Sequence, residues 1–460
     1  MSRLLNAIYV CFLVIGSPWL LWRILVARKN RRGWNQKLLG LVESRESNNA
    51  CIWMHAVSVG EVNLLAPIIR QIELVRPDLD IVISTGTETG FDLATRKFPS
   101  HYSFFCPFDF TWAINRVLKR IRPSMLVLAE LELWPNLIKT TRDAGVPVAV
   151  VNGRLSANSF RGYRRFHWLV RQTFERLSLV AAQNESYAQR FLSLGCNPAS
   201  VQVTGSVKFD GVETDPDNRQ SQKLARIAGI GSHDQVFVAG STQIEEDLMA
   251  ARVHQRLCQS NPNRRLILVP RHPQRCGALA TQLSQIGVES ILRSRLQESP
   301  DIDGISSVDQ PGDHDEHPDS TNPPVLIVDV IGELAAWWGC ADAAYVGGSL
   351  GRRGGQNMIE PAAYGVPVSF GPNTENFREI VQELLAHDAA VVIHDDFTLS
   401  AFVERAFTNS DWSKTIGKRA REVVASHLGA SQKTVELLDV VLSKSDQVQA
   451  ESETSSVQAA

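Results

Sequence analysis

The sequence has few cysteines, and no two of them are spaced as a metal-binding or redox motif. Its seven cysteines are odd in number and form no CxxC pair. This distribution argues against a disulfide framework and against a zinc knuckle. We therefore expect reduced thiols, mostly buried, in a cytoplasmic domain. The cysteines are Cys11, Cys51, Cys106, Cys196, Cys258, Cys276 and Cys340.

An excess of charge of one sign is also absent from the chain as a whole. The 460 residues have a formal net charge of -2, which gives no indication of a nucleic-acid partner. Acidic residues are missing, however, from residues 1–42. The basic residues of this stretch are Arg3, Arg23, Arg28, Lys29, Arg31, Arg32 and Lys37.

The N-terminus contains an uncharged apolar run, Leu4 to Trp22, interrupted by Gly16-Ser17-Pro18. Its length is close to the ~20 residues that cross a bilayer as a helix. A signal peptide is disfavoured because no small-x-small cleavage site follows and the basic cluster lies on the wrong side. A buried helix is the second alternative. We expect residues 1–40 to be a membrane anchor and basic segment, spanning or interfacial, whose cations from Arg23 to Lys37 contact membrane lipids on the cytoplasmic face.

From Cys51 onward, short apolar runs alternate with helical patterns. This alternation predicts an α/β class with parallel βαβ units in two similar halves and a ligand cleft between them. We expect domains at 41–215 and 216–442, a disordered acidic insert at 296–324 and a disordered tail at 443–460. The runs expected as strands are CIWMHAVSV, IVISTG, MLVLAELELW, VPVAVVNGR, LVAAQNE, VQVTGSVKFD, QVFVAGST, RLILVPRH, VESILRS, PVLIVDV, AAYVGGS and VPVSFG.

The motif HAVSVGE places Glu61 just after the first strand of this series. In an open α/β sheet, that carboxyl edge faces the ligand crevice. Ser58 and Gly60 suit a tight turn between strand and helix. Glu61 could accept the proton of an attacking hydroxyl, or it could simply complement the dipole of the helix.

Two further strand ends of the first half carry polar residues. STGTETG contains Thr87, which could bind a ligand or only cap the next helix. LAELELWPN contains Glu130 and Glu132 within an apolar run, where burial without partners is costly. A cleft position and a structural ion pair are both compatible with these two acids.

The second half contains a predicted anion site. GST, residues 240–242, offers backbone amides and hydroxyls, and Arg271 and His272 follow a strand in VPRHPQR. Arg271 is a permanent cation with a fork suited to phosphate.

The richest segment is YVGGSLGRRGGQNMIEP, in which a strand runs into Gly347, Gly348 and Ser349. Asn357 opens a predicted helix that contains Glu360. Glycines before a helix start can bind phosphate through free N–H groups, and Glu360 could hold a sugar hydroxyl. The alternative is a glycine-rich turn with a satisfied carboxylate.

A catalytic metal is not expected. DLD at 78–80 precedes a strand, and DID at 301–303 and DHD at 313–315 fall in the acidic insert. None lies at a strand end, where a metal–nucleotide site needs carboxylates. We therefore expect no metal and no cofactor, with Arg271, loop amides and the helix dipole meeting the charge of the leaving group.

An ordered set of motifs carries a family resemblance that reaches from the N-terminus to about residue 430, outside the acidic insert. The chain resembles the 3-deoxy-D-manno-octulosonic acid (Kdo) transferases of Gram-negative lipopolysaccharide synthesis. The motifs are HAVSVGE, STGTETG, PFD, ELELWPN, NGRLS, GSVKFD, GST, PRHP and GGSL…GGQNMIEPAAYGVPV…NF.

The resemblance implies a GT-B glycosyltransferase of two facing Rossmann-like domains at the inner membrane, without a metal. It implies inverting transfer of Kdo from CMP-Kdo to a lipid A precursor of lipid IVA type. Glu61 matches the catalytic base of the family. The CMP-Kdo site would contain Arg271, His272, Gly347, Gly348, Ser349, Asn357 and Glu360. The acceptor or cleft residues would be Ser58, Gly60, Thr87, Glu132 and Lys208.

The chain departs from the family pattern at Gln356, where the family commonly has His, and at Gln243-Ile244-Glu245-Glu246, where it reads His-x-Gly-Glu-Glu. Two other functions stay open. One is a related membrane-associated GT-B enzyme acting on a UDP-sugar, or an epimerase of the same fold. The other is a non-catalytic nucleotide-binding module.

Overall fold

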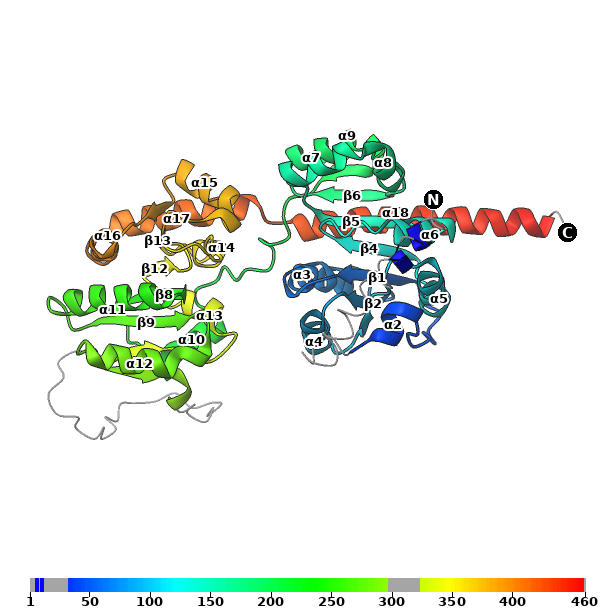
Figure 1. The fold of residues 1–460 in the computed structure, drawn as a ribbon. Coiled ribbons are helices and arrows are strands. Elements are labelled where there is room, and N and C mark those ends of the chain that lie inside the picture. The colour runs from blue at the N-terminus through cyan, green and yellow to red at the C-terminus, as the bar shows by residue number, and fades with distance from the viewer. Residues whose placement is uncertain (1–4, 8, 12–31, 297–322, 459–460) are drawn as a thin grey trace. The chain divides into compact units, whose positions relative to one another are not determined.

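The computed structural model describes residues 5–7, 9–11, 32–296 and 323–458. Within them the chain forms two compact units, one of residues 1–211 with 427–460 and the other of residues 212–426 (Figure 1). Much of the predicted N-terminal anchor, at residues 1–4, 8 and 12–31, lies outside the described residues. So does most of the acidic insert, at 297–322. No helix of the described part is both long and apolar enough to cross a bilayer.

The first unit is built on a seven-stranded parallel sheet with the order β3-β2-β1-β4-β5-β6-β7. Its strands are β1 (Cys51–Ala56), β2 (Asp80–Thr85), β3 (Tyr102–Phe105), β4 (Met125–Ala129), β5 (Val148–Gly153), β6 (Leu179–Ala182) and β7 (Val201–Val203). Its helices are α2 (Trp34–Leu39), α3 (Val59–Val75), α4 (Glu88–Lys97), α5 (Thr111–Ile121), α6 (Pro135–Asp143), α7 (Ala157–Arg165), α8 (His167–Glu175), α9 (Glu185–Ser193) and α18 (Ala430–Gln458).

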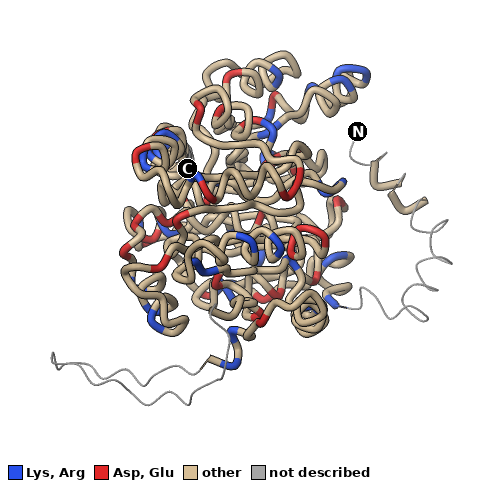
Figure 2. The backbone as a smooth tube through the Cα atoms, turned by 90° about the vertical axis from the view of Figure 1, so that its left-hand side faces the viewer, with Lys and Arg blue, Asp and Glu red and all other residues tan. Residues whose placement is uncertain are grey.

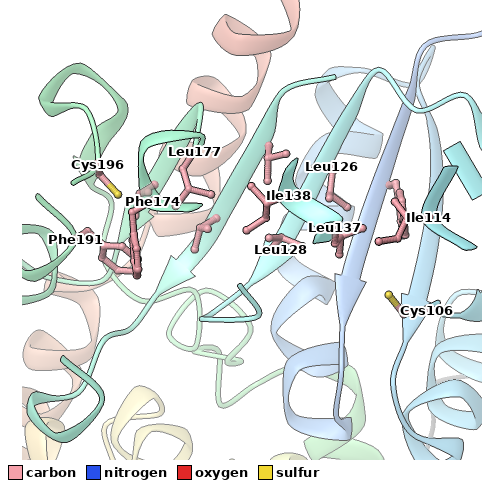
Figure 3. Packing of buried hydrophobic residues seen from close by; sticks show 14 of the residues in the cluster. Cys106, Ile114, Leu126, Leu128, Leu137, Ile138, Phe174, Leu177, Phe191 and Cys196 are labelled. Atoms are coloured by element: carbon pink, nitrogen blue, oxygen red, sulfur yellow. The ribbon is translucent and has the colours of Figure 1, made fainter. Parts of the chain in front are cut away.

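Both faces of this sheet are covered, which explains why its strands read as continuous apolar runs. In β1, Trp53 packs into one hydrophobic cluster and its neighbour Met54 into the cluster on the opposite face. Figure 3 shows Leu126 and Leu128 of β4 beside Leu137 and Ile138 of α6 in the first cluster. The sequence therefore buries alternate residues of one strand on two sides, as a doubly wound sheet requires.

The second unit repeats the architecture with the order β10-β11-β9-β8-β12-β13-β14, again all parallel. Its strands are β8 (Gln235–Thr242), β9 (Arg264–Pro270), β10 (Ser290–Leu292), β11 (Val325–Ile327), β12 (Ala343–Val346), β13 (Val368–Phe370) and β14 (Ala390–Val392). Its helices are α10 (Arg219–Ile227), α11 (Ile244–Cys258), α12 (Cys276–Gln285), α13 (Leu334–Trp338), α14 (Ile359–Ala363), α15 (Arg378–Ala386), α16 (Asp396–Thr408) and α17 (Ser410–Ser426). The predicted class of two Rossmann-like α/β domains is confirmed.

Two predictions about the C-terminus are wrong. Residues 427–442 belong to the first unit, not to the second, because Val435, Leu438 and Leu442 of α18 pack into the same hydrophobic cluster as Ile68 and Ile72 of α3. The tail from 443, expected to be disordered, continues α18 to Gln458. An apolar stripe on the helix start, not the polar composition of its end, decides where this segment folds.

Two strand predictions also differ from the structure, and two further strands were missed. The run MLVLAELELW ends as a strand at Ala129, because Glu130 takes a left-handed backbone conformation (φ 55°) while its N–H donates to Val151 O. Only residues 201–203 of VQVTGSVKFD form a strand. The short strands β3 and β14, each of which pairs with only one neighbour at a sheet edge, were not predicted.

Candidate functional site

Glu61 lies where the sequence placed it, in the first turn of α3 after β1. Ser58 is the N-cap of α3, and its hydroxyl donates to Glu61 Oε1 at 3.1 Å. The Val57 N–H donates to Glu61 Oε2 at 2.6 Å. Gly60 leaves the space in front of this turn open, since a Cβ there would meet only Ser58 Oγ at 3.8 Å. The carboxylate is thus held in one orientation by its own loop.

Burial raises the pKa of Glu61, and the nearby carboxylates Glu132 and Glu130 raise it further against the opposing hydrogen bonds from Val57 and Ser58. The three acids come together because β1 and β4 are neighbours in the sheet and end at the same edge. A carboxylate with a raised pKa binds a proton more readily than an ordinary one. The arrangement therefore suits a general base better than a simple helix-capping acid.

Glu132 and Thr87 have different contacts near Glu61. Glu132 is half-buried, its pKa is raised by burial, and it accepts a hydrogen bond of 3.0 Å from Trp134 Nε1. It forms no ion pair with any described residue, so a structural ion pair does not explain it. Thr87 caps α4, as the alternative interpretation proposed, and also donates to Val57 O at 3.0 Å. It thereby joins the loop after β2 to the loop that holds Glu61.

The GSVKFD segment has a structural role that the sequence did not reveal. Asp210 accepts hydrogen bonds from the backbone N–H groups of Gly429 (2.7 Å) and Ser431 at the start of α18. Lys208 is exposed on the turn before it, and no described contact joins Lys208 to Glu61. Asp210 thus caps the helix that returns to the first unit.

In the second unit, the glycine loop after β12 surrounds an internal carboxylate. Glu246 of α11 accepts hydrogen bonds from the N–H groups of Gly348 (2.7 Å), Ser349 (3.0 Å) and Leu350 (3.1 Å). The Tyr345 hydroxyl donates to the same carboxylate at 2.8 Å. Glu246 also completes the capping box of α11.

These contacts overturn one part of the predicted phosphate site. The Gly347 N–H bonds Gly240 O, and the amides of Gly348 and Ser349 are occupied by Glu246. The Ser349 hydroxyl is buried and donates to Val346 O. Gly347 is required for close packing, because a Cβ there would lie 2.5 Å from Thr242 Cα. The amides of this loop therefore hold a side chain of the protein and are not free for a ligand.

Arg271 and His272 are exposed at the end of β9, next to the end of β8, where the Arg271 N–H donates to Thr242 O at 3.1 Å. The Arg271 guanidinium has no hydrogen-bond or ion-pair partner among the described residues. Its neighbour Arg275, in contrast, pairs with buried Asp247 at 2.5 Å. Burial raises the pKa of Asp247 to about 6, against the effects of Thr242 and Arg275. The Arg271 guanidinium, unlike that of Arg275, is therefore available to bind an anion.

Asn357 and Glu360 lie together, but only Glu360 is on a helix: α14 begins at Ile359, so Asn357 precedes the helix that it was predicted to open. The Asn357 amide donates to Glu360 Oε1 at 3.0 Å, and Trp338 Nε1 donates to Glu360 Oε2 at 3.2 Å. Burial raises the pKa of Glu360. Helix α14 has only five residues, Ile359–Ala363, so it contributes little dipole. The loop reaches this pair through Gly355, whose N–H donates to Gly348 O at 2.8 Å.

The sequence reasoning did not identify Glu246, Tyr345 or Trp338 as part of these arrangements. A capping-box pattern, Gln243 followed by Glu246, was the available signal for the first. The described residues contain no group of three or more His, Cys, Asp or Glu side chains that could hold a metal ion. The DID and DHD motifs lie outside the described residues.

Comparisons with known proteins point to one family. Residues 29–211 match the family model described as 3-deoxy-D-manno-octulosonic-acid transferase (kdotransferase). The 3-deoxy-D-manno-octulosonic acid transferase of Haemophilus influenzae is 30% identical over 396 residues, which cover 85% of this chain and 87% of that protein. The transferase of the same name from Bordetella pertussis is 31% identical over 402 residues, covering 85% and 87%.

Solved structures agree with the fold. A glycosyltransferase from Rickettsia africae matches with a TM-score of 0.55 at 12% identity, over 86% of this chain and 99% of that one. A UDP-GlcNAc 2-epimerase from Neisseria meningitidis matches with the same TM-score and identity, over 84% and 99%. At such identity the likeness concerns the two-domain α/β architecture alone.

Proposed function

Because the chain belongs to the 3-deoxy-D-manno-octulosonic acid (Kdo) transferase family, we propose that it moves Kdo from CMP-Kdo to a lipid A precursor of lipid IVA type. The proposal includes inversion at the anomeric carbon, no metal, and a location on the cytoplasmic face of the inner membrane. The observation that carries it is Glu61, a carboxylate of raised pKa held by Val57 and Ser58 at the carboxyl edge of the first sheet.

In the proposed step, a hydroxyl of the lipid acceptor attacks the anomeric carbon of Kdo. Glu61 takes the hydroxyl proton as the new carbon–oxygen bond forms. The bond from the anomeric carbon to the CMP phosphate oxygen breaks, and CMP leaves with the electron pair. A single displacement of this kind inverts the anomeric carbon.

In this proposal, the Arg271 side chain binds the departing phosphate and balances its negative charge. Arg271 is exposed and has no described partner, whereas the amides of Gly348 and Ser349 are engaged by Glu246. A guanidinium fork binds phosphate oxygens strongly even without a metal. Glu360, oriented by Asn357 and Trp338, is a candidate acceptor for a donor hydroxyl.

The deciding experiment incubates the full chain with freshly generated CMP-Kdo and a tetraacylated lipid A precursor in EDTA, followed by mass spectrometry. A mass gain of one or more Kdo units is expected, and Glu61→Gln should slow its appearance by about 10²- to 10⁴-fold. If the product mass increases only after magnesium is added, the metal-independent mechanism is wrong. If folded protein transfers nothing from CMP-Kdo but does transfer from a UDP-sugar, the proposed donor is wrong.

A further inference from the structure

A cavity of the first unit lies at the amino-terminal edge of its sheet. Its volume is about 580 Å³, which is in the range of small-molecule sites. Pro147, Ser178 and Ser200, which directly precede β5, β6 and β7, are among its lining residues. Because the strands of this sheet are parallel, their amino ends lie at the edge opposite to the carboxyl ends, where Glu61 lies. The cavity is therefore distinct from the proposed catalytic site.

Much of the cavity lining is aliphatic. Helix α18 contributes Leu437, Val440 and Val441, and Leu177 and Leu179 line the cavity near the start of β6. The Val440 side chain is 50% exposed. Among the described residues that line the cavity, none is aromatic, so the cavity offers no ring on which a planar base could stack. This lining suits an alkyl chain better than a nucleobase.

The charged residues of the lining leave an excess of positive charge. They are Arg142, Arg176, Lys444 and Glu175. Glu175 is already paired with Arg171, at 2.7 Å. Arg142 and Lys444 are exposed, and their side chains form no hydrogen bond or ion pair with any described residue. Basic and acidic residues are interspersed along most of the described backbone (Figure 2), whereas this cavity places uncompensated cations beside an aliphatic surface.

We propose that this cavity, lined by Arg142, Arg176, Leu177, Val440, Val441 and Lys444, binds a free fatty-acid carboxylate. The carboxylate pairs with the uncompensated cations, because hydrogen bonds between ionised partners are the stronger ones. The acyl chain lies along the aliphatic residues of α18 and the start of β6, and each methylene removed from water adds to the affinity. This binding does not depend on the proposed transfer of Kdo.

The test uses the full chain and a dodecanoate probe that carries a photoactivatable diazirine near its methyl end. Irradiation attaches the probe to the residues that it contacts, and peptide mass spectrometry locates the label. Label is expected on peptides that contain residues 437–441 or 177–179. Because the position of the label is read directly, probe bound to the apolar run near the N-terminus is distinguished from probe in the cavity.

Variants of the lining test the two halves of the proposal. Arg142→Ser/Lys444→Ser should reduce the labelling of these peptides about tenfold, because it removes the charge-assisted contacts of the carboxylate. Val440→Asp should reduce it as well, since it places a negative charge beside the acyl chain. The control Arg70→Ser/Arg96→Ser removes two exposed arginines from α3 and α4 of the same unit and should leave the labelling unchanged. Far-UV circular dichroism verifies the fold of each variant.

Competition defines the chemistry of the ligand. Unlabelled octanoate, decanoate and dodecanoate should displace the probe with increasing affinity, by up to about fourfold for each added methylene. Dodecanol, which lacks the charge, should compete about tenfold less well than dodecanoate. A phosphatidylglycerol that carries the same diazirine should not label these peptides, because the proposed ligand is a free single-chain molecule.

Four results would overturn the proposal. The first is label that avoids both peptides, and the second is labelling that persists in Arg142→Ser/Lys444→Ser. The third is equal competition by dodecanol and dodecanoate, which would show that the cavity does not recognise the anion. The fourth is label from the phosphatidylglycerol probe, which would assign the cavity to a bilayer lipid.

Discussion

Glu246 on α11 accepts a 2.7 Å hydrogen bond from the Gly348 N–H, which lies in a loop about a hundred residues further along the chain. This contact, with those from Ser349, Leu350 and Tyr345, ties α11, the helix that follows β8, to the glycine loop of the same unit. The backbone N–H groups of this loop therefore bind a carboxylate of the protein itself. The position of the loop, and through Gly355 that of Asn357 and Glu360, depends on this one carboxylate.

Replacing Glu246 with Gln should destabilise the protein by about 2 kcal/mol, because an amide NH₂ would face backbone donors that the carboxylate now satisfies. Donor binding should weaken as the glycine loop shifts. Urea denaturation followed by circular dichroism measures the first effect and calorimetric titration with CMP the second. Glu245→Gln, at the exposed neighbouring residue, is the control and should change neither.

Glu61→Gln should lower kcat by about 10²- to 10⁴-fold, the usual contribution of a general base, while CMP binding stays the same. Steady-state kinetics with the lipid acceptor measures the effect. Glu73→Gln removes a carboxylate from the same helix, where it contacts His101 at 3.0 Å, and should keep nearly full activity. Undiminished turnover in Glu61→Gln would rule out its role as the base.

The pH profile should reflect the acidic environment of Glu61. Since burial and the charges of Glu132 and Glu130 raise its pKa, the acidic limb of kcat/KM should lie above the usual range of a glutamate. Glu132→Gln removes one negative charge, so the pKa of Glu61 falls and the limb moves to lower pH. The exposed control Glu185→Gln should leave the acidic limb in place. If the limb also stays in place in Glu132→Gln, the electrostatic coupling between Glu132 and Glu61 is contradicted.

Asp109 should make the protein less stable as the pH rises from about 4 to 6. Burial raises its pKa from 3.8 to about 6, against hydrogen bonds from Asn136, Leu137 and Tyr9. The folded state therefore binds more protons than the unfolded state in this window, and its stability falls with rising pH by roughly 3 kcal/mol in total. Melting temperatures of wild type and Asp109→Asn across this range isolate the effect, because the variant lacks the titrating group.

Asp210→Ala should loosen the start of α18 without unfolding the protein. The substitution leaves the N–H groups of Gly429 and Ser431 without their acceptor, at a cost of about 1 kcal/mol typical of a lost helix cap. Hydrogen exchange should show faster exchange at residues 429–435 than in wild type. Asp215→Ala, an exposed acid in the connection between the units, should leave that exchange unchanged.

Much of the fold could be predicted because its signals are local. Continuous apolar runs such as CIWMHA indicate strands buried on both faces, and β1 follows that pattern fully. Ser58 and Thr87 precede their helices as N-caps in the structure. Glu61 could be placed at a strand end for the same reason, since a strand and the turn after it lie within ten residues. Edge strands such as β3 are short and half-exposed, so their patterns are weaker.

Local patterns along the chain therefore specify the α/β class, the two Rossmann-like units, the family, and the position of Glu61 at a sheet edge. Three features became visible in the folded protein alone: the amides of Gly348 and Ser349 bind Glu246, Asp210 caps α18, and α18 returns to the first unit. Each of these depends on residues far apart in the chain. Patterns in sequence report short-range geometry, whereas the partner of a buried polar group is set by which distant segments pack against it.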